Sequence, residues 1–375
     1  MDIADFNFEL PDELIAQEPP AERGTSRLLV LRRTTGQIEH SSFAQLADYL
    51  QRGDLLVLNN TKVFPARLLG RRLPGGGAVE CLLLRQLPTP QLPPPKTPES
   101  SRNDAVGAGS LGVGNFTLWD ALMHPGQKLK SGSQVLFEGD GVRLHGEIVA
   151  MHFHGRRTIR LWADHGVDVA DAIDRLGHVP LPPYIKRPDR PSDRVRYQTI
   201  YARERGSIAA PTAGLHFTAG TLAALEARGV ERTEVTLHVG YGTFKPIRAD
   251  RVDDHVVDPE AFAVTDAAAE AITRARRERR RVIAVGTTTV RVLESLAIAD
   301  DGRIQAASGE TTLFIRPGHE FRIVNGLITN FHLPQSSLLM LVSAFAGRDV
   351  VRTAYDAAIA ERYRFYSYGD SMLIV

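Results

Sequence analysis

Six polar segments that contain glycine, threonine or histidine supply most of the side chains in this sequence that could do chemistry. Each one alone is typical of a turn or a helix cap, because Gly and Pro mark turns and Thr caps helices. Several follow a predicted strand, and α/β folds place ligands at the carboxyl ends of strands. Their recurrence there indicates a binding site. The segments are residues 59–61, 196–199 with 210–217, 238–244, 286–291, 329–334 and 366–370.

Three of these segments carry a histidine, namely His216, His238 and His332. An imidazole titrates near neutral pH, so it can take or give a proton in a reaction. Segment 286–291 adds one glycine and three threonines at the start of a predicted helix, where an anion or sugar hydroxyls can be held. It lacks the second and third glycines of a Rossmann fingerprint, which weakens the case for a Rossmann methyltransferase.

The sequence offers little for disulfide or metal chemistry. Cys81 is the only cysteine, so no disulfide can form within the chain and no cysteine-based metal site can be built. We expect Cys81 to be buried in a strand. His152 and His154 alternate along a predicted strand, but no third ligand lies near them in the sequence, so we predict no metal.

The charge of the chain is almost balanced, with 45 Lys and Arg against 44 Asp and Glu and a formal net charge of +1. Composition therefore gives no argument for nucleic-acid binding, and any basic surface must be local. Residues 274–281, RARRERRR, read equally well as a phosphate site and as a solvated helix face. The amino-terminal residues form no hydrophobic leader, and the longest apolar stretch, 338–346, is too short to cross a membrane. We expect a cytoplasmic protein that does not contact a membrane.

Two kinds of pattern predict the elements that position these residues. Short runs rich in Val, Leu and Ile predict strands at residues 78–84, 134–137, 142–151 and 158–162, which indicates a small barrel or sandwich. The rest of the chain alternates, which favours α/β layers. Its predicted strands are residues 55–58, 234–238 and 282–285, and its predicted helices are residues 43–50, 221–228, 265–280, 288–297 and 349–362, the last capped by Asp349.

These patterns predict an α/β fold with two domains. A large discontinuous mixed α/β domain takes residues 1–61 and 163–375, and a small β-barrel domain at residues 62–162 is inserted in it. Residues 87–115 are rich in Pro, Gly and Ser and poor in groups to bury, so we expect a disordered surface loop within the barrel domain.

Long motifs follow one another along the chain in a fixed order. They include LNNTKVFPARL, HVPLPPYIKR, RYQTIYA, APTAGLHFT, HVGYGTFKPI, VIAVGTTTVRVLES, GLITNFHLPQSSLLMLVSAFAG and YRFYSYGDSMLI. From Phe6 to the carboxyl terminus, apart from the loop at 87–115, the chain resembles the S-adenosylmethionine:tRNA ribosyltransferase-isomerases of queuosine biosynthesis. The resemblance implies an α/β domain with an inserted β-barrel, as the patterns do.

The resemblance also implies an activity. Members use S-adenosylmethionine as a co-substrate and tRNA as the partner, and neither a metal nor a protein partner is implied. The ribosyl moiety is transferred and isomerised onto 7-aminomethyl-7-deazaguanine at the tRNA wobble position. Epoxyqueuosine forms, and adenine and methionine are released.

Such a reaction needs a base for the C5′ hydrogens, which the sulfonium makes acidic, and an acid for the departing adenine. His216, His238 and His332 are the candidate catalytic residues, without individual roles. Tyr241 or Phe244 could offer a π face to the sulfonium. Asn330, Thr288 and Thr289 could bind ribose hydroxyls, and Arg291 and Lys245 could bind phosphate or the methionine carboxylate. The full set of predicted substrate-binding residues is Thr212, Gly214, Tyr241, Gly242, Thr243, Lys245, Glu260, Thr288, Thr289, Arg291 and Asn330.

A nearly neutral protein must hold tRNA with a localised set of arginines. One candidate patch contains Arg274, Arg276, Arg277, Arg279 and Arg280, and a second contains Arg187, Arg190, Arg194 and Arg196. Arg156 and Arg157 of the predicted barrel are a third candidate.

At one place the chain departs from the family pattern. Relatives usually read His-x-Met-His-Ser-Glu where this chain has HVVDPE at residues 255–260, so His255 and Glu260 remain but a histidine and a serine are lost. The change keeps two alternatives open. One is a divergent S-adenosylmethionine-dependent transferase with another acceptor, and the other is a tRNA-binding relative without catalysis.

Overall fold

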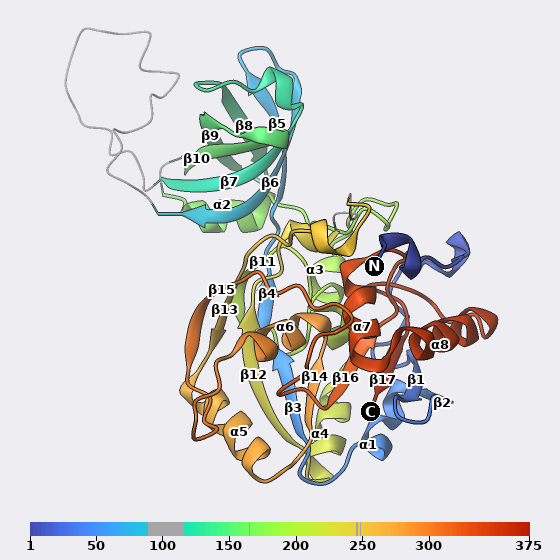
Figure 1. The fold of residues 1–375 in the computed structure, drawn as a ribbon. Helices are drawn as coiled ribbons and strands as arrows, with labels where there is room; N and C mark the ends of the chain where they lie inside the picture. The colour runs from blue at the N-terminus through green and yellow to red at the C-terminus, as the bar shows by residue number, and fades with distance from the viewer. Residues whose placement is uncertain (89–115, 165, 245–246, 248) are drawn as a thin grey trace, which may run out of the picture. The chain divides into compact units, whose positions relative to one another are not determined.

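The structure is a computed structural model, and it describes residues 1–88, 116–164, 166–244, 247 and 249–375. The chain forms two compact units (Figure 1), of which the first contains Met1–Val63 and Leu181–Val375 and the second contains Phe64–Pro180. The second unit reaches beyond residue 162, because helix α2 (Val169–Leu176) buries Val169 and Ile173 in the core that the barrel strands form. Most of the loop predicted at 87–115 lies outside the described residues.

A mixed sheet of nine strands forms the centre of the first unit, in the order β15-β13-β12-β3-β14-β16-β17-β1-β2. Strands β12, β3, β14 and β16 run parallel, so their carboxyl ends meet at one edge of the sheet. The bounds are β1 (Arg27–Arg32), β2 (Gln37–Ser42), β3 (Leu55–Asn59), β12 (Glu231–Leu237), β13 (Glu260–Val264), β14 (Val282–Val285), β15 (Ala307–Thr311), β16 (Gly326–Asn330) and β17 (Ser371–Ile374).

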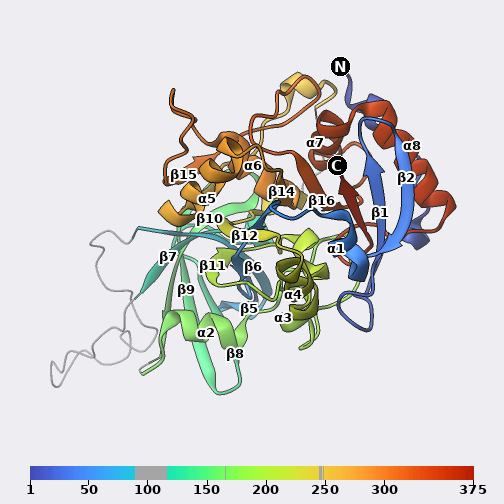
Figure 2. The ribbon, with the colours of Figure 1, turned by 90° about the horizontal axis from the view of Figure 1, so that it is seen from below.

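Helices cover both faces of this sheet, because its central strands are apolar on both sides. Leu55 and Val57 of β3 pack in one core with α5, α6, α7 and α8, while Leu56 and Leu58 pack in another with α1 and α4. Figure 2 shows these layers with the sheet between them. The helices are α1 (Leu46–Tyr49), α4 (Ala219–Ala227), α5 (Asp266–Arg277), α6 (Thr287–Ser295), α7 (Ser337–Ala346) and α8 (Arg348–Ala360).

All five predicted helices differ from the observed ones by one or more residues at their ends, and three of the differences have a clear local cause. Residues 43–50 form a 3-10 turn followed only by the short α1, since Leu50 is already extended before the turn at Gly53. Helix α5 ends at Arg277, close to Arg279, which adopts a φ of +55°. Helix α8 is capped by Gly347, so Asp349 is not the cap; it lies in the first turn, where a carboxylate favours the positive end of the helix dipole.

The second unit is a closed barrel of six strands in the order β10-β7-β6-β5-β8-β9. Cys81 is buried in this barrel, as predicted. The turn between β8 and β9 is made by Asp140 and Gly141, both with positive φ, which suits a tight hairpin. The strands are β5 (Arg67–Leu73), β6 (Ala78–Leu87), β7 (Thr117–His124), β8 (Gln134–Gly139), β9 (Val142–Met151) and β10 (Arg156–Ala163).

Candidate active site

A pocket in the first unit lies where the central parallel strands end. Residues from five of the six polar segments line it, and Asn59 of the sixth contacts it through Thr288, whose hydroxyl oxygen is 3.4 Å from Asn59 Nδ2. Three of the segments, 238–244, 286–291 and 329–334, follow β12, β14 and β16 at the same edge of the sheet. Segment 366–370 reaches that edge because it precedes β17, which runs antiparallel to β16. Thr212, Thr288, Asn330 and His332, all predicted from the sequence, line this pocket.

The start of helix α6 forms one wall of the pocket. Strand β14 ends at Val285, and Gly286 turns the chain into the helix with a φ of +88°, a conformation that favours glycine. Gly286, Thr287 and Thr288 line the pocket, so the first turn of α6 faces it. Thr289 does not line it, because its hydroxyl donates to the carbonyl oxygen of Val285 at 2.6 Å.

His332 lines the pocket directly, two residues beyond the end of β16. Its Nε2 lies 2.8 Å from the Thr329 hydroxyl, and its backbone N–H donates to the Tyr355 hydroxyl at 3.0 Å. The side chain is buried, and this burial lowers the pKa of His332 to about 3. His332 is therefore neutral at pH 7.

The other two predicted histidines do not line the pocket. His216 is buried behind Asn330, with Nδ1 2.8 Å from Ser26 Oγ and Nε2 3.2 Å from Asn330 Nδ2. His238 follows β12 and turns to Thr61, whose hydroxyl oxygen is 2.8 Å from its Nδ1. Burial lowers the pKa of both rings, to about 4 for His216.

Sequence reasoning singled out segment 366–370, which contains Tyr366, but it missed Tyr184 and the pairing of the two rings. Tyr184 and Tyr366 both line it, and their rings are stacked with centroids 4.1 Å apart. The Tyr184 hydroxyl lies 2.5 Å from Ser367 Oγ. Tyr366 adopts a φ of +73°, which is unusual for a residue with a side chain and typical of functional sites. Tyr184 stands in the motif HVPLPPYIKR, but nothing in that motif distinguishes a pocket residue from a packed one.

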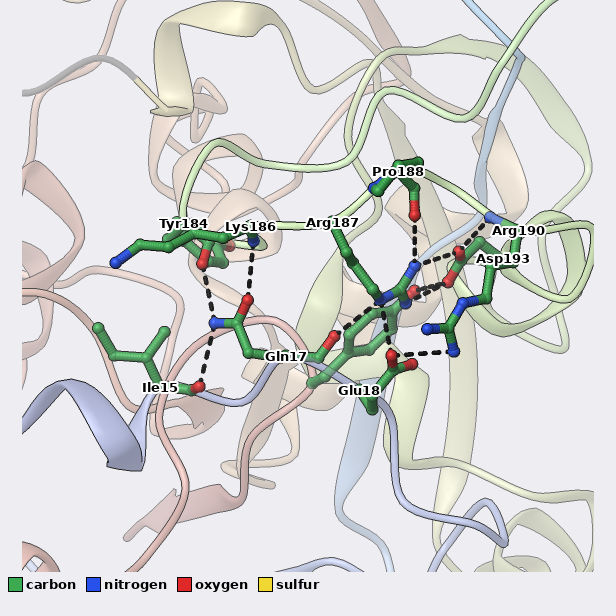
Figure 3. A network of polar contacts seen from close by, with 10 residues as sticks. Ile15, Gln17, Glu18, Tyr184, Lys186, Arg187, Pro188, Arg190 and Asp193 are labelled. Carbon is green, nitrogen blue, oxygen red and sulfur yellow. Dashed lines mark hydrogen bonds and ion pairs between the residues drawn. The ribbon is translucent and has the colours of Figure 1, made fainter.

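A polar network holds the segment that follows Tyr184 (Figure 3). Gln17 Nε2 donates to the Tyr184 carbonyl oxygen at 2.9 Å, and its Oε1 accepts from the Lys186 backbone N–H at 2.7 Å. Two nitrogens of Arg187 donate to the buried carboxylate of Asp193, at 2.7 and 2.9 Å. These contacts fix the backbone on which Tyr184 reaches the pocket.

The Asp193 carboxylate accepts from four donors in all. The backbone N–H of Arg190 and the hydroxyl of Tyr368 each donate to it at 2.8 Å, in addition to Arg187. Burial alone would raise the pKa of this carboxyl, but the hydrogen bonds from Arg187, Arg190 and Tyr368 outweigh it and hold the pKa below its usual value. Asp193 is thus charged and fully hydrogen-bonded.

The predicted ligands Glu260 and Arg291 form a buried ion pair with each other, away from the pocket lining. Arg291 Nε also donates to the Leu313 carbonyl oxygen at 2.9 Å, and Glu260 Oε1 accepts from the Gly240 backbone N–H at 2.8 Å. The pair therefore anchors the loop that begins at Gly240. All three guanidinium nitrogens of Arg291 bond to acceptors within the protein, so they are not directed at a phosphate.

The remaining predicted substrate ligands are placed as follows. Gly214 packs so tightly that a Cβ would lie 2.2 Å from the Tyr201 hydroxyl oxygen, so its role is close packing. Tyr241 and Gly242 do not line the pocket. Asp258, at which the chain departs from the family pattern, packs on Gly242. A Cβ added to Gly242 would lie 2.7 Å from a carboxylate oxygen of Asp258. Lys245 and the side chains of Thr243 and Phe244 lie outside the described residues.

The first arginine patch lies at the opposite edge of the sheet. Arg276, Arg277, Arg279 and Arg280 line a second pocket, next to the amino ends of β14 and β16. Arg274 does not line that pocket and forms a 2.9 Å ion pair with Glu231.

The second arginine patch follows Tyr184 along the chain. Arg194 and Arg196 belong to helix α3 (Asp193–Arg196), and Arg190 is exposed and pairs with Glu18 at 3.0 Å. Arg196 donates to the Ala21 carbonyl oxygen at 3.0 Å. In the second unit, Arg157 is buried and bonded to carbonyl oxygens, and Arg156 pairs with Asp120.

Within the described ranges, no group of three or more His, Cys, Asp or Glu could hold a metal ion. Nor does any helix in those ranges combine the length and apolar character that a membrane span requires.

Comparisons with known proteins identify the family. The family model described as "Queuosine biosynthesis protein" matches residues 3–374. Proteins named S-adenosylmethionine:tRNA ribosyltransferase-isomerase from Desulfitobacterium hafniense and Carboxydothermus hydrogenoformans are 47% and 49% identical to the chain, with all of each chain covered. The crystal structure of S-adenosylmethionine tRNA ribosyltransferase from Thermotoga maritima is 36% identical, with a TM-score of 0.52, 99% of this chain covered and 100% of that chain. The chain belongs to the family of queuosine biosynthesis proteins.

Proposed function

We propose that this enzyme transfers and isomerises the ribosyl moiety of S-adenosylmethionine onto 7-aminomethyl-7-deazaguanine at the tRNA wobble position. Epoxyqueuosine would form, with release of adenine and methionine. The observation that carries the proposal is the meeting of six family motifs in one pocket of a chain that matches the family over residues 3–374.

The pocket offers partners for the parts of S-adenosylmethionine. The first turn of α6 has backbone N–H groups free of helical hydrogen bonds, and they suit the methionine carboxylate. The stacked rings of Tyr184 and Tyr366 offer π faces to the sulfonium. Asn330 and Thr288 supply polar atoms for the sugar.

Among the three histidines, His332 is best placed to take the C5′ proton. The support for this role is its position, because it is the histidine that lines the pocket. Burial lowers its pKa to about 3, so the ring is neutral at pH 7 but only weakly basic. Tyr366 can act as a donor to the leaving adenine. Burial raises the pKa of its hydroxyl, so the O–H stays protonated, and that hydroxyl has no partner among the described residues.

We propose that the second arginine patch binds the phosphates of tRNA. Arg190 and Arg194 lie on the exposed part of the segment that carries Tyr184 into the pocket, so phosphates bound there would be close to a base in the pocket. The first patch, at the amino edge of the sheet, faces away from that pocket. Exposed ion pairs such as that of Arg190 with Glu18 contribute little and can be exchanged for a phosphate.

Incubation with S-adenosylmethionine and tRNA that carries the aminomethyl base, followed by nucleoside mass analysis, tests the proposal. Epoxyqueuosine should appear, with adenine and methionine released in equal amounts. tRNA with unmodified guanine at the wobble position is the control and should not react. Methylated tRNA with S-adenosylhomocysteine would contradict the proposal. Release of adenine with a modified product on another acceptor would favour a divergent transferase.

A further inference from the structure

A buried amide at the end of β16 sets a chemical requirement for the ligand. Asn330 is 2% exposed and lines the pocket. Its Nδ2 donates to the Tyr366 carbonyl oxygen at 2.9 Å and lies 3.2 Å from His216 Nε2. Its Oδ1 has no hydrogen-bond partner in the part of the chain that the structure describes.

Chemistry fixes the direction in which this amide points. A carbonyl oxygen only accepts, so the amide atom that faces the Tyr366 carbonyl must be the nitrogen. A rotation of the amide by half a turn would place Oδ1 of Asn330 against that oxygen and repel it. Both hydrogens of Nδ2 are therefore used inside the protein, and Oδ1 remains as an acceptor for the pocket.

The same reasoning fixes the state of His216. Because Asn330 Nδ2 donates, His216 Nε2 must accept, so the ring is neutral and its proton is on Nδ1. That proton is donated to Ser26 Oγ, 2.8 Å away. Burial lowers the pKa of His216 to about 4, which agrees with a neutral ring. With both nitrogens engaged, this histidine has neither a lone pair nor a proton to offer a substrate.

We propose that Ser26, His216 and Asn330 form a relay that presents Asn330 Oδ1 to a sugar hydroxyl of the nucleoside ligand, and that His216 is a positioning residue. This inference rests on the proposed function, since S-adenosylmethionine is the ligand that brings the sugar. A buried acceptor without a partner is costly, so the pocket favours a ligand with a donor at this point. The described lining contains no carboxylate, which favours an uncharged O–H over an ammonium.

Calorimetric binding of S-adenosylmethionine and its 2′-deoxy and 3′-deoxy analogues to the full chain tests the ligand half of the proposal. One of the two analogues should bind the unsubstituted protein at least about tenfold more weakly than the parent. Asn330→Ala should bind the parent and that analogue alike. Equal binding of all three ligands to the unsubstituted protein would overturn the inference alone. No binding of S-adenosylmethionine at all would overturn the proposed function and the inference with it.

Substitutions at His216 test the positioning half. His216→Leu removes the acceptor and should weaken S-adenosylmethionine binding about as much as Asn330→Ala does, and the double variant should be no worse than Asn330→Ala, because both act on one interaction. His216→Gln supplies a carbonyl acceptor and should restore both the affinity and kcat. If His216→Leu does not fold, as judged by its thermal transition, the His216→Gln result decides. A loss of kcat of about 10²-fold in His216→Gln with unchanged affinity would overturn the proposal, since that is the effect of losing a proton-transferring histidine.

Discussion

At the level of single residues, hydrogen bonding separates three histidines that look equivalent in the sequence. His216 is 4% exposed and His332 is 6% exposed, yet only His332 lines the pocket. His238 follows its strand in the same way but turns to Thr61. A position just after a strand brings a histidine to the edge of the sheet where the pocket lies. The hydrogen-bond partner of its side chain then determines whether the ring faces the pocket.

Replacement of His332 tests its proposed part in proton transfer. His332→Gln should lower kcat by about 10²-fold or more, because the neutral ring that takes the proton is lost. The affinity for S-adenosylmethionine should change only a few-fold. Steady-state kinetics together with calorimetry separate the two effects, and His152→Gln, an exposed residue of the second unit, is the matched control. Unchanged kcat in His332→Gln would show that the base lies elsewhere.

The two buried histidines should also make folding sensitive to acid. An unfolded histidine takes up a proton near pH 6.5, whereas folded His216 does so only near its pKa of about 4 and His332 near about 3. Between these values the unfolded state binds more protons, so the free energy of unfolding falls as the pH falls below about 6.5.

Urea unfolding at a series of pH values from 7.5 to about 4.5 measures this dependence. His216→Gln should flatten the slope by up to about 1.4 kcal/mol per pH unit. His152→Gln, which removes an exposed ring of the second unit, is the matched control. An unchanged slope in His216→Gln would mean that the ring is already protonated in the folded protein.

At the level of elements, the segment from Tyr184 to Asp193 is held mainly by side chains. Gln17 forms hydrogen bonds with the backbone of Tyr184 and Lys186, and Asp193 forms a bidentate ion pair with Arg187. Asp193 is 2% exposed, whereas the Glu18 side chain that also contacts Arg187 is 48% exposed. The two carboxylates therefore differ in what their loss should cost.

Asp193→Asn should destabilise the protein by about 3 kcal/mol, because it leaves Arg187 without its buried counter-charge. Glu18→Gln, which removes an exposed carboxylate from the same arginine, should cost less than about 1 kcal/mol. Denaturant unfolding of both variants gives the comparison. Equal effects from the two substitutions would show that the Asp193 network does not hold the segment.

Much of the element pattern could be predicted from local signals. The strand at 282–285 is confirmed at both ends, because an apolar run stands between Arg281 and Gly286. Thr265 caps α5, and Gly229 follows α4 with a φ of +82°. The sequence patterns do not predict strands β1, β2, β13, β15, β16 and β17. The pairing of β1 with β17 joins the two ends of the chain, and no local signal reports on it.

The candidate site could be predicted as segments but not as contacts. Of the five polar segments that line the pocket, 238–244, 286–291 and 329–334 follow parallel strands, and the strand pattern predicts the strands before the first two. The Arg291 pairing with Glu260 and the stacking of Tyr184 on Tyr366 depend on residues far apart in the sequence. No local sequence pattern reveals such pairs. From the sequence alone, Arg291 is therefore interpreted as a substrate ligand and Tyr184 as a residue packed in the core.

At the scale of the whole molecule, the first unit separates two features along its sheet. The candidate active site lies at the carboxyl ends of the parallel strands, and an arginine-lined pocket lies at their amino ends. A net charge of +1 gives the protein no general attraction for tRNA. The tRNA must therefore bind a local group of arginines, either near the carboxyl ends of the parallel strands or near their amino ends.

The salt dependence of tRNA binding distinguishes the two edges. The double variant Arg190→Gln with Arg194→Gln should weaken binding and flatten the plot of log affinity against log salt by up to about two units, one for each phosphate that the protein no longer neutralises. The triple variant Arg276→Gln, Arg277→Gln and Arg279→Gln should leave that slope unchanged. The opposite result would place tRNA at the amino edge.

The fate of the ribose carbons tests the central claim most directly. S-adenosylmethionine labelled with ¹³C in its ribose, and a second sample labelled in its methyl group, are each incubated with the enzyme and tRNA carrying the aminomethyl base. The account predicts that the wobble nucleoside gains the ribose label and none of the methyl label, while the methyl label leaves with methionine. Methyl label in the tRNA, or ribose label that stays with the released adenine, would contradict it.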